Sequence, residues 1–241
     1  VADQILGDAG QRRLDIGTKT GIQLSGGIDS TLIGYYAKRL GSQDFSEAVA
    51  VVDGTGPLGE EKFIDYVGKR LNLNVSKFTM TPEYFLTNCE RMVWHNDAPV
   101  YKPYFACFLK LGELAREHVS VLLCGEGADE IAGGYSRFSA GVYWPFLAQI
   151  GLKGGSITSY DSYASYATMA GETITDLYSN DWTHVDELIN ERIELFNRFQ
   201  GNNFTKHLKF EITECLPEAC LRQDKMMMAS SVANRFPFPD N

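Results

Sequence analysis

The 241-residue sequence contains no apolar run long enough to cross a membrane. A membrane-spanning helix needs about 20 consecutive, predominantly apolar residues, and no stretch here approaches that length. The first four residues, Val-Ala-Asp-Gln, also lack the basic and apolar regions of a secretory signal. We therefore expect a cytoplasmic protein without a membrane partner.

Cysteines are few and do not have the spacing of a metal or redox motif. The chain has five, an odd number, and no two are separated by only two residues. Structural zinc sites and redox motifs place cysteine pairs at that spacing. We therefore predict reduced, mostly buried thiols at Cys89, Cys107, Cys124, Cys215 and Cys220.

Basic residues are outnumbered, since 22 lysines and arginines stand against 31 aspartates and glutamates, for a formal net charge of −9. Broad nucleic-acid binding requires a basic stripe that neutralises the phosphate backbone, so we expect no nucleic-acid partner. A small anion would have to be held locally, by oriented backbone N–H groups and a divalent cation.

What the chain does have is a regular alternation of apolar runs and helical patterns. With 44% hydrophobic residues it can bury a full core. Strands and helices that alternate in this way favour an α/β fold, a parallel sheet with helices on both faces. Such sheets bind ligands at the carboxyl ends of their strands. We predict strands at residues 21–24, 48–52, 75–78 and 119–124, and helices at residues 31–40 (ended by Gly41), 63–71, 82–94 (capped by Thr81) and 104–117.

The second half of the sequence is predicted to be mainly helical. We expect one domain over residues 1–241, with an α/β nucleotide-binding core at 20–138 and a helical part at 139–241 that is truncated. Pro217 is expected near the end of a helix or at a kink. Two helices are indicated by apolar residues at helical spacing: Leu188, Ile189, Ile193 and Phe196 in one, and Leu208, Ile212 and Leu216 in the other.

Residues 25–30, Ser-Gly-Gly-Ile-Asp-Ser, lie between the first predicted strand and its helix, and we call them the glycine turn. Gly26 and Gly27 let the backbone approach a ligand closely, and Asp29 offers a carboxylate to Mg²⁺. Backbone N–H groups converge on an anion where such a turn opens a helix. The turn therefore predicts a phosphate site, although it lacks the lysine of the common nucleotide-binding loop. A plain glycine-rich turn is the competing explanation.

Residues 124–130, Cys-Gly-Glu-Gly-Ala-Asp-Glu, follow the last predicted strand directly, and we call them the acidic motif. Its three acids repel one another unless a cation or a cationic substrate lies between them. If the first and last strands run parallel, Asp29 and Asp129 emerge at the same edge of the sheet. Two carboxylates and polyphosphate oxygens would then complete the shell of Mg²⁺. The alternative is a capped helix start with exposed acids.

The C-terminal region carries a third set of residues, 224–229 (Asp-Lys-Met-Met-Met-Ala) and 234–240 (Asn-Arg-Phe-Pro-Phe-Pro-Asp). On its own, the methionine run favours core filling over a ligand surface. Arg222 and Lys225 either reach a phosphate as point charges or neutralise nearby acids. The sequence leaves both possibilities open.

Taken together, the three sets of residues resemble the synthetase domain of the asparagine synthetase family, whose loop reads Ser-Gly-Gly-x-Asp-Ser. The match covers residues 25–30, residues 125–130 with the Gly-Gly-Tyr at 133–135, and the segment from Asp224 to the Arg-x-Pro-Phe-x-Asp ending at 235–240. The glycine turn alone is also similar to those of GMP and NAD synthetases, whereas the acidic motif and the ending are much more specific. The resemblance implies an adenine nucleotide α-hydrolase-like fold.

The resemblance also implies an enzyme, an ATP-dependent ligase that uses Mg²⁺. The side-chain carboxylate of aspartate would attack the α-phosphorus of ATP, pyrophosphate would leave, and ammonia would capture the acyl-adenylate to give asparagine. Glu126 would be the acid/base or orienting carboxylate near the attacking amine, and Asp29 and Asp129 would bind Mg²⁺. The implied pyrophosphate contacts are Ser25, Gly26, Gly27, Asp29 and Ser30, and Leu24, Val52 and Gly125 would border the adenosine.

The sequence departs from the family pattern at both ends. Members carry a glutaminase domain before this region and an active-site lysine beyond the Arg-x-Pro-Phe ending, and the sequence has neither. A glutaminase domain or subunit and a second copy of the chain are the expected protein partners. Two other interpretations stay open: an enzyme that closes an amide within one substrate, as β-lactam synthetases and lasso-peptide cyclases do, and a non-catalytic ATP-binding module.

Overall fold

The computed structural model describes residues 2–14, 17–40, 45–52, 60–100, 102–135, 138 and 185–239. The chain divides into two compact units, residues 1–128 with 218–241 and residues 129–217, and each is described by itself. Gly41, Asp240 and the predicted onset of the helical part at residue 139 lie outside the described residues. Among the helices that the structure describes, none is both long and apolar enough to span a bilayer.

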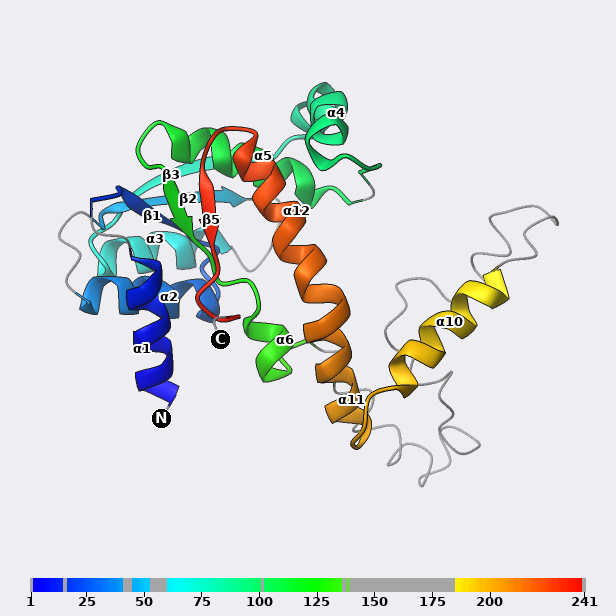
Figure 1. Ribbon diagram of the computed structural model, residues 1–241. Helices are drawn as coiled ribbons and strands as arrows, with labels where there is room; N and C mark the ends of the chain where they lie inside the picture. The colour runs from blue at the N-terminus through cyan, green and yellow to red at the C-terminus, as the bar shows by residue number, and fades with distance from the viewer. Residues whose placement is uncertain are drawn as a thin grey trace. The chain divides into compact units, whose positions relative to one another are not determined.

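A five-stranded parallel sheet forms the centre of the first unit (Figure 1). The strands lie in the order β3-β2-β1-β4-β5. The predicted parallel sheet is therefore confirmed, and its first four strands coincide with the four predicted apolar runs. The strands are β1 (Thr20–Gln23), β2 (Glu47–Val52), β3 (Asn74–Thr79), β4 (Val121–Leu123) and β5 (Ala233–Arg235).

The fifth strand, β5, is missing from the sequence prediction. It pairs in parallel with β4, with Leu123 opposite Arg235, and the Cys124 N–H donates to the Arg235 carbonyl oxygen at 3.0 Å. A strand of three residues is too short to display an alternating pattern, so its pairing partner determines it. The pairing brings the start of the Arg-x-Pro-Phe ending beside the strand that leads into the acidic motif.

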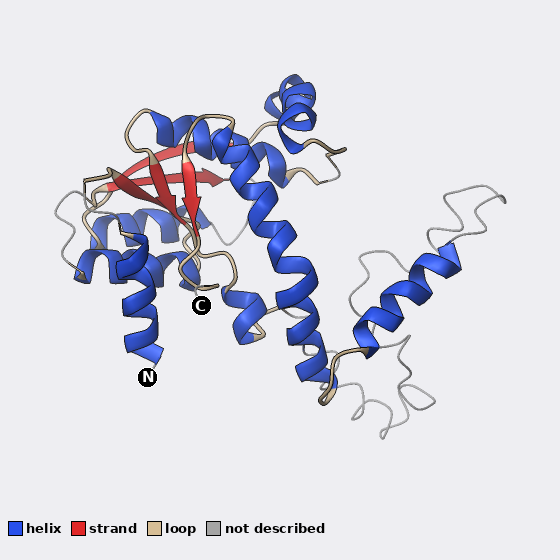
Figure 2. Cartoon of the chain, in the orientation of Figure 1, coloured by secondary structure: helices blue, strands red, loops and turns tan. Residues whose placement is uncertain are grey.

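Helices cover both faces of the sheet, as predicted (Figure 2). In β2, Ala48 and Ala50 belong to the core that α2 and α3 complete. Val49, between them, belongs to the opposite core, with residues of α5 and Met227. Because both faces are covered, the strand sequence is apolar throughout. The helices that precede β4 are α1 (Ala2–Arg13), α2 (Ile28–Arg39), α3 (Glu60–Arg70), α4 (Pro82–Asn96) and α5 (Tyr104–Arg116).

Two helix starts show how well local signals predict boundaries. α4 begins as predicted, because the Thr81 side chain accepts a hydrogen bond from the Tyr84 N–H at 3.2 Å. The predicted start of α2 at Thr31 is wrong, since the helix begins at Ile28. Ile28 is 83% exposed, so it adds nothing to the buried apolar spacing from which the start was predicted. The last residues of the glycine turn are therefore helical.

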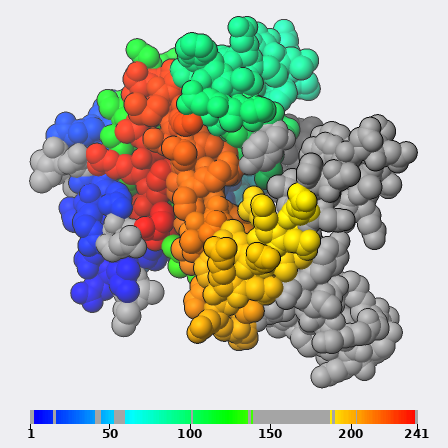
Figure 3. All heavy atoms as spheres, turned by 45° about the vertical axis from the view of Figure 1, so that its right-hand side comes forward, coloured from blue at the N-terminus to red at the C-terminus, as the bar shows by residue number. Residues whose placement is uncertain are grey.

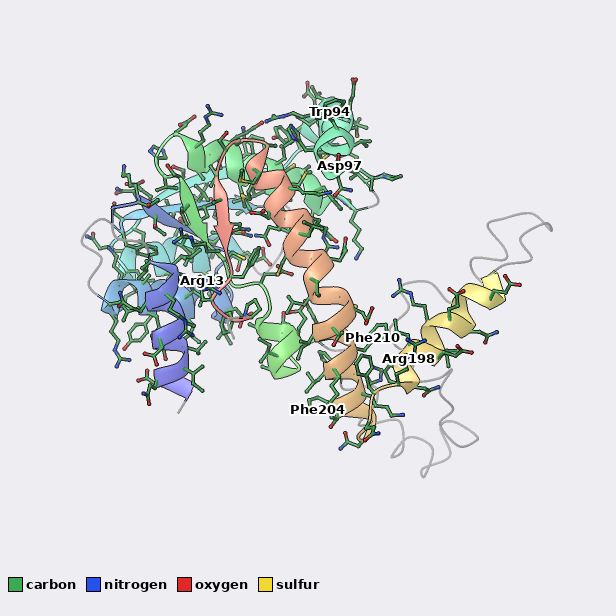
Figure 4. The ribbon with its side chains drawn as sticks, in the orientation of Figure 1. Arg13, Trp94, Asp97, Arg198, Phe204 and Phe210 are labelled. Atoms are coloured by element: carbon green, nitrogen blue, oxygen red, sulfur yellow. The ribbon has the colours of Figure 1, made fainter. Side chains whose placement is uncertain are left out.

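The described part of the C-terminal region is helical up to Met228, as predicted. α6 (Ala128–Ala132) precedes this region, and the described elements within it are α10 (Val185–Asn197), α11 (Asn203–Phe210), a π-helical turn (Glu211–Cys215) and α12 (Leu216–Met228). Pro217 is the second residue of α12, directly after the π-helical turn. The helix therefore does not end at Pro217 but changes there from π-helical to α-helical geometry. Phe210, labelled in Figure 4, contacts the Phe196 ring with centroids 5.9 Å apart.

The residues of α12 from Glu218 onward belong to the first unit. In the space-filling view the red C-terminal residues lie against the orange end of α12 (Figure 3). Here the Asn234 N–H donates to Asp224 Oδ1 at 3.3 Å. α12 and β5 together therefore bring the C-terminal segment back to the sheet.

None of the five cysteines forms a disulfide, as predicted. Only Cys124 is buried, however, and the other four are partly exposed. The prediction that most of the thiols are buried is therefore wrong.

Candidate active site

The glycine turn and the start of the acidic motif meet at the point where the strand order reverses. From β1 the chain continues through β2 to β3 on one side, whereas β4 and β5 lie on the other side. β1 and β4 are adjacent and parallel, with Ile22 opposite Leu123. The glycine turn follows the carboxyl end of β1, and the acidic motif follows that of β4. Open parallel sheets bind ligands at such a switch point.

The glycine turn is closed by its own hydroxyl groups. The two serine hydroxyl oxygens, Ser25 Oγ and Ser30 Oγ, lie 3.0 Å apart. The Ser25 N–H donates to Ser30 Oγ at 3.2 Å, and the Gly27 N–H donates to Ser25 Oγ at 3.3 Å. Ser30 is buried and Ser25 is exposed, and both hydroxyl groups hold the turn.

The N-terminus of α2 is the end of the turn that suits an anion. Its N-cap is Gly27, which has no side chain to cap the first-turn N–H groups, and oriented N–H groups at a helix N-terminus bind anions. Gly26 has a φ of +76°, and an added Cβ would come within 2.9 Å of the Cβ of Phe63 on α3. Only glycine satisfies both conditions.

Gly125 lies directly against the glycine turn. A Cβ at this position would approach the Ser30 backbone nitrogen to 2.9 Å and both the carbonyl carbon and the Cβ of Asp29 to 3.1 Å. The structure thus places the first glycine of the acidic motif in contact with the last two residues of the glycine turn. The residues that form this contact are far apart in the sequence and meet only because β1 and β4 are neighbours in the sheet.

The other predicted site residues of the first unit are Leu24, Val52 and Glu126. Leu24 is 1% exposed and Val52 is 6% exposed, and both belong to one hydrophobic core. Glu126 is partly exposed, and its N–H donates to the Cys124 sulfur at 3.3 Å. Leu24 and Val52 therefore offer little side-chain surface to a ligand, whereas Glu126 keeps part of its surface open.

Asp129 belongs to the second unit, and Asp29 to the first. Their predicted pairing therefore stays a prediction. Within the second unit, the Gly134 N–H donates to the Asp129 carbonyl oxygen at 3.0 Å, and a Cβ at Gly134 would overlap the Asp129 carboxylate. Tyr135 donates its hydroxyl hydrogen to Glu130 Oε1 at 2.6 Å, and Glu130 is buried. The Gly-Gly-Tyr sequence therefore shapes the surroundings of both carboxylates, and the alternative of exposed acids is wrong for Glu130.

No group of three or more His, Cys, Asp and Glu side chains forms a metal cluster within the described part of the chain. Asp29 and Asp129 each offer carboxylate oxygens, the hard donors that Mg²⁺ prefers. Mg²⁺ commonly takes one or two carboxylates together with substrate phosphates. The donor chemistry therefore fits an ion that arrives with a polyphosphate.

The basic residues of α12 face acids. Lys225 Nζ donates to Asp97 Oδ2 at 3.0 Å and to the Asn96 carbonyl oxygen at 2.9 Å, which ties α12 to α4, where Asp97 is labelled in Figure 4. Arg222 pairs with Glu218. Of the two possibilities for these residues, neutralisation of nearby acids is the one that the structure supports.

The methionine run divides between core and surface. Met226 and Met227 are both fully buried, whereas Met228 is 51% exposed. The prediction of core filling is therefore confirmed for the first two residues.

A groove of about 870 Å³ begins at the glycine turn, where Gly26 and Gly27 line it, and continues between α2 and α3. Tyr35 and Tyr66 are exposed beside it. Among the described residues that line the groove, none is acidic. The sequence did not indicate this feature, because it depends on how the two helices pack.

Gln223 is a further polar residue at the switch point that the sequence analysis did not single out. It is 0% exposed and hydrogen bonds with residues at the ends of β1 and β4. The available signal is its position on α12, since Ala219, Gln223 and Met226 follow one another at helical spacing and all are buried. A polar side chain on such an apolar stripe indicates a buried hydrogen-bonding role.

The asparagine synthase family model matches residues 2–241 of the chain. An asparagine synthetase [glutamine-hydrolyzing] of Bacillus subtilis is 34% identical over 126 residues, which are 48% of this chain and 18% of that protein. A putative asparagine synthetase [glutamine-hydrolyzing] of Mycobacterium tuberculosis is 26% identical over 280 residues, covering 98% of this chain and 40% of that protein. The chain thus spans less than half the length of these relatives.

Two solved structures are distantly similar. An NH3-dependent NAD synthetase from Campylobacter jejuni has a TM-score of 0.40 at 13% identity, covering 83% of this chain and 95% of that chain. An NMN synthetase from Francisella tularensis has a TM-score of 0.41 at 14% identity, covering 96% of this chain and 95% of that chain. These likenesses are too weak to bear on the site.

Proposed function

Because the chain belongs to the asparagine synthase family, we propose that it uses ATP to form an amide, with AMP and pyrophosphate as the other products. The side-chain carboxylate of aspartate attacks the α-phosphorus of ATP, and ammonia then captures the β-aspartyl-adenylate to give asparagine. The observation that carries this proposal is the contact between Gly125 and residues Asp29 and Ser30. Two loops that are proposed to hold opposite ends of one ATP molecule lie against each other at the switch point.

In this proposal the glycine turn holds the pyrophosphate portion of ATP. The first-turn N–H groups of α2 point toward the phosphates, and the Ser25 hydroxyl, on the exposed side of the turn, donates to a phosphate oxygen. Ser30 keeps the turn closed from its buried position. Reactions at phosphorus depend mainly on positioning and charge neutralisation, so a preformed turn is the main contribution of this segment.

The adenosine lies at the ends of β1, β2 and β4. Leu24 and Val52 are buried, so their contribution is backbone groups and a fixed apolar floor. Gly125 carries no side chain, which lets the loop after β4 lie directly against the glycine turn. Because the two loops lie against each other, one ligand of the length of ATP can contact both of them.

Glu126 is proposed to act on the attacking amine. An ammonium ion must lose a proton before its nitrogen can attack the acyl-adenylate, and the partly exposed Glu126 carboxylate can accept that proton or orient the nitrogen. Asp29 and Asp129 are proposed to hold Mg²⁺. When bound, this ion would neutralise charge on the phosphates.

The proposal is tested by incubating the chain with ATP, Mg²⁺, aspartate and ammonium, and measuring pyrophosphate and asparagine. We expect pyrophosphate release that depends on aspartate, with equimolar asparagine, and loss of both in Asp29→Ala. ATP binding without pyrophosphate release would instead favour the non-catalytic module. Pyrophosphate release that requires a substrate other than aspartate would favour an intramolecular amide-forming enzyme of the same family.

The remaining parts of the proposal rest on the family resemblance. We propose that a glutaminase domain or subunit supplies the ammonia and that two copies of the chain form a dimer in the cytoplasm. Measuring asparagine formation with glutamine in place of ammonium tests the first point, because only a chain joined to a glutaminase can use glutamine.

A further inference from the structure

A chain of hydrogen bonds through Gln223 links the ends of two strands. Gln223 Nε2 donates to Gln23 Oε1 at 2.5 Å. The Cys124 thiol donates to Gln223 Oε1 at 3.7 Å, and the Glu126 N–H donates to the Cys124 sulfur at 3.3 Å. Gln23 is the last residue of β1, and Cys124 is the first residue after β4, so one side chain from α12 connects the two.

The position of this chain of bonds is specific to the switch point. Gln23 lies two residues before Ser25, where the glycine turn begins, and Cys124 directly precedes Gly125. Neighbouring parallel strands are joined by backbone bonds along their length, but beyond their ends only side chains and loop contacts can set the distance between the loops. The Gln223 amide lies at the base of both loops.

The two central members of this hydrogen-bond chain, Gln223 and Cys124, are buried, so their bonds are costly to lose. Gln223 is 0% exposed and Cys124 is 1% exposed. Burial raises the pKa of the Cys124 thiol far above its usual range, so the thiol keeps its proton at neutral pH and remains a donor. A buried amide without partners is strongly disfavoured, and a fully bonded network fixes one arrangement.

We infer that Gln223 is a positioning residue that holds the glycine turn and the Gly125–Glu126 loop at a fixed separation. It acts through Gln23 and Cys124 and does not touch the nucleotide. Only the effect of this role on ATP binding rests on the proposed function, because a nucleotide that spans both loops binds best when their separation is fixed. The fixed separation itself is a property of the fold and can be measured without ATP.

The test replaces Gln223 by methionine, which has a similar length but cannot form either hydrogen bond. The control is Met227→Ala, because Met227 is also fully buried on α12 but packs in the core on the α5 side of the sheet. Hydrogen–deuterium exchange of residues 24–30 and 124–127 is measured in the free proteins, and ATP affinity is measured by calorimetry. Both are recorded well below the thermal midpoint of each variant.

We expect Gln223→Met to speed exchange in both segments and to weaken ATP binding about fivefold or more, the loss that corresponds to one buried hydrogen bond. Met227→Ala should lower the thermal midpoint without either effect. Gln23→Met should change both in the same direction, and the double variant should be no worse than Gln223→Met alone, because Gln223→Met already removes the bond between the two glutamines.

The outcomes separate the inference from the proposed function. Unchanged exchange in both segments of Gln223→Met overturns the inference, whatever happens to ATP binding. Faster exchange together with unchanged ATP affinity supports the fixed separation but overturns its consequence for nucleotide binding. If the parent chain does not bind ATP but exchange in both segments rises, the proposed function fails and the positioning role stands.

Discussion

Replacing Gly125 by alanine perturbs the candidate site at the contact between its two loops. The added Cβ would lie 2.9 Å from the Ser30 backbone nitrogen and 3.1 Å from the carbonyl carbon and Cβ of Asp29. Ordinary contacts of a Cβ begin at 3.4 Å, and contacts under 3.0 Å require something to shift. Because these atoms belong to the backbone and to the base of a side chain, they cannot swing away as the end of a flexible side chain would. The loops must move apart by about half an ångström.

This movement should lower both the stability of the fold and the affinity for ATP. Inserting a methyl group into a well-packed region typically destabilises a protein by about 1–3 kcal/mol. The effect on function is expected to be larger, since a displacement of about 1 Å in a positioned site can cost about 100-fold in rate. We therefore expect Gly125→Ala to bind ATP at least about tenfold more weakly while it remains folded.

The assay pairs calorimetric ATP titration with thermal unfolding, and Gly7→Ala is the control. A Cβ at Gly7, on α1, would meet nothing within 4 Å, so this substitution should leave ATP binding unchanged and stabilise the helix slightly. If Gly125→Ala binds ATP as tightly as the parent, the two loops do not share a nucleotide, and the argument from their contact is wrong.

Three further predictions concern charged groups. Glu126→Gln should bind ATP normally but release pyrophosphate and form asparagine more slowly, about 100-fold for a lost acid/base group, and full activity would remove Glu126 from the proposal. Gly134→Ala should push the Asp129 carboxylate aside, so that this variant needs a higher Mg²⁺ concentration than the parent to bind ATP. If both proteins need the same Mg²⁺ concentration, Asp129 does not bind the metal. Burial raises the pKa of Glu113, but the hydrogen bond from Arg91 and those from two other donors outweigh it, and the pKa is lowered overall. Because its pKa is lowered, the Glu113 carboxylate stabilises the fold at pH values above its ordinary pKa near 4.3, and this stabilisation is lost as the pH falls. The thermal midpoint of Glu113→Gln should therefore fall less steeply than that of the parent between about pH 6 and pH 3. An equally steep fall in both proteins would contradict this role of Glu113.

The sequence was sufficient to predict the sheet where its strands are apolar and covered on both faces. β2 is the clearest case, because residues 47–52 are nearly all apolar and pack against helices on each side. The meeting of the two motifs was also predictable, since each follows a strand of the same parallel sheet. The same reasoning correctly predicted that β1 and β4 run parallel.

The features that could not be predicted are those that depend on partners distant in the sequence. β5 is a strand only because β4 is available to pair with it, and the start of α2 shifts to Ile28 because an exposed residue carries no burial signal. Gln223 was overlooked for a related reason. Its partner Gln23 is 200 residues away in the sequence, and nothing near either glutamine indicates the other.

The late position of β5 in the chain has a consequence for biosynthesis. β4 is complete at Leu123, but its outer edge pairs with Ala233–Arg235, more than 100 residues later. Until the ribosome has released those residues, the nascent chain carries an open strand edge with unpaired N–H and C=O groups, the kind of surface that joins neighbouring chains into aggregates. Contacts of such long sequence separation also form slowly. We therefore expect chaperones that shield nascent chains to raise the yield of this protein more than its stability would suggest.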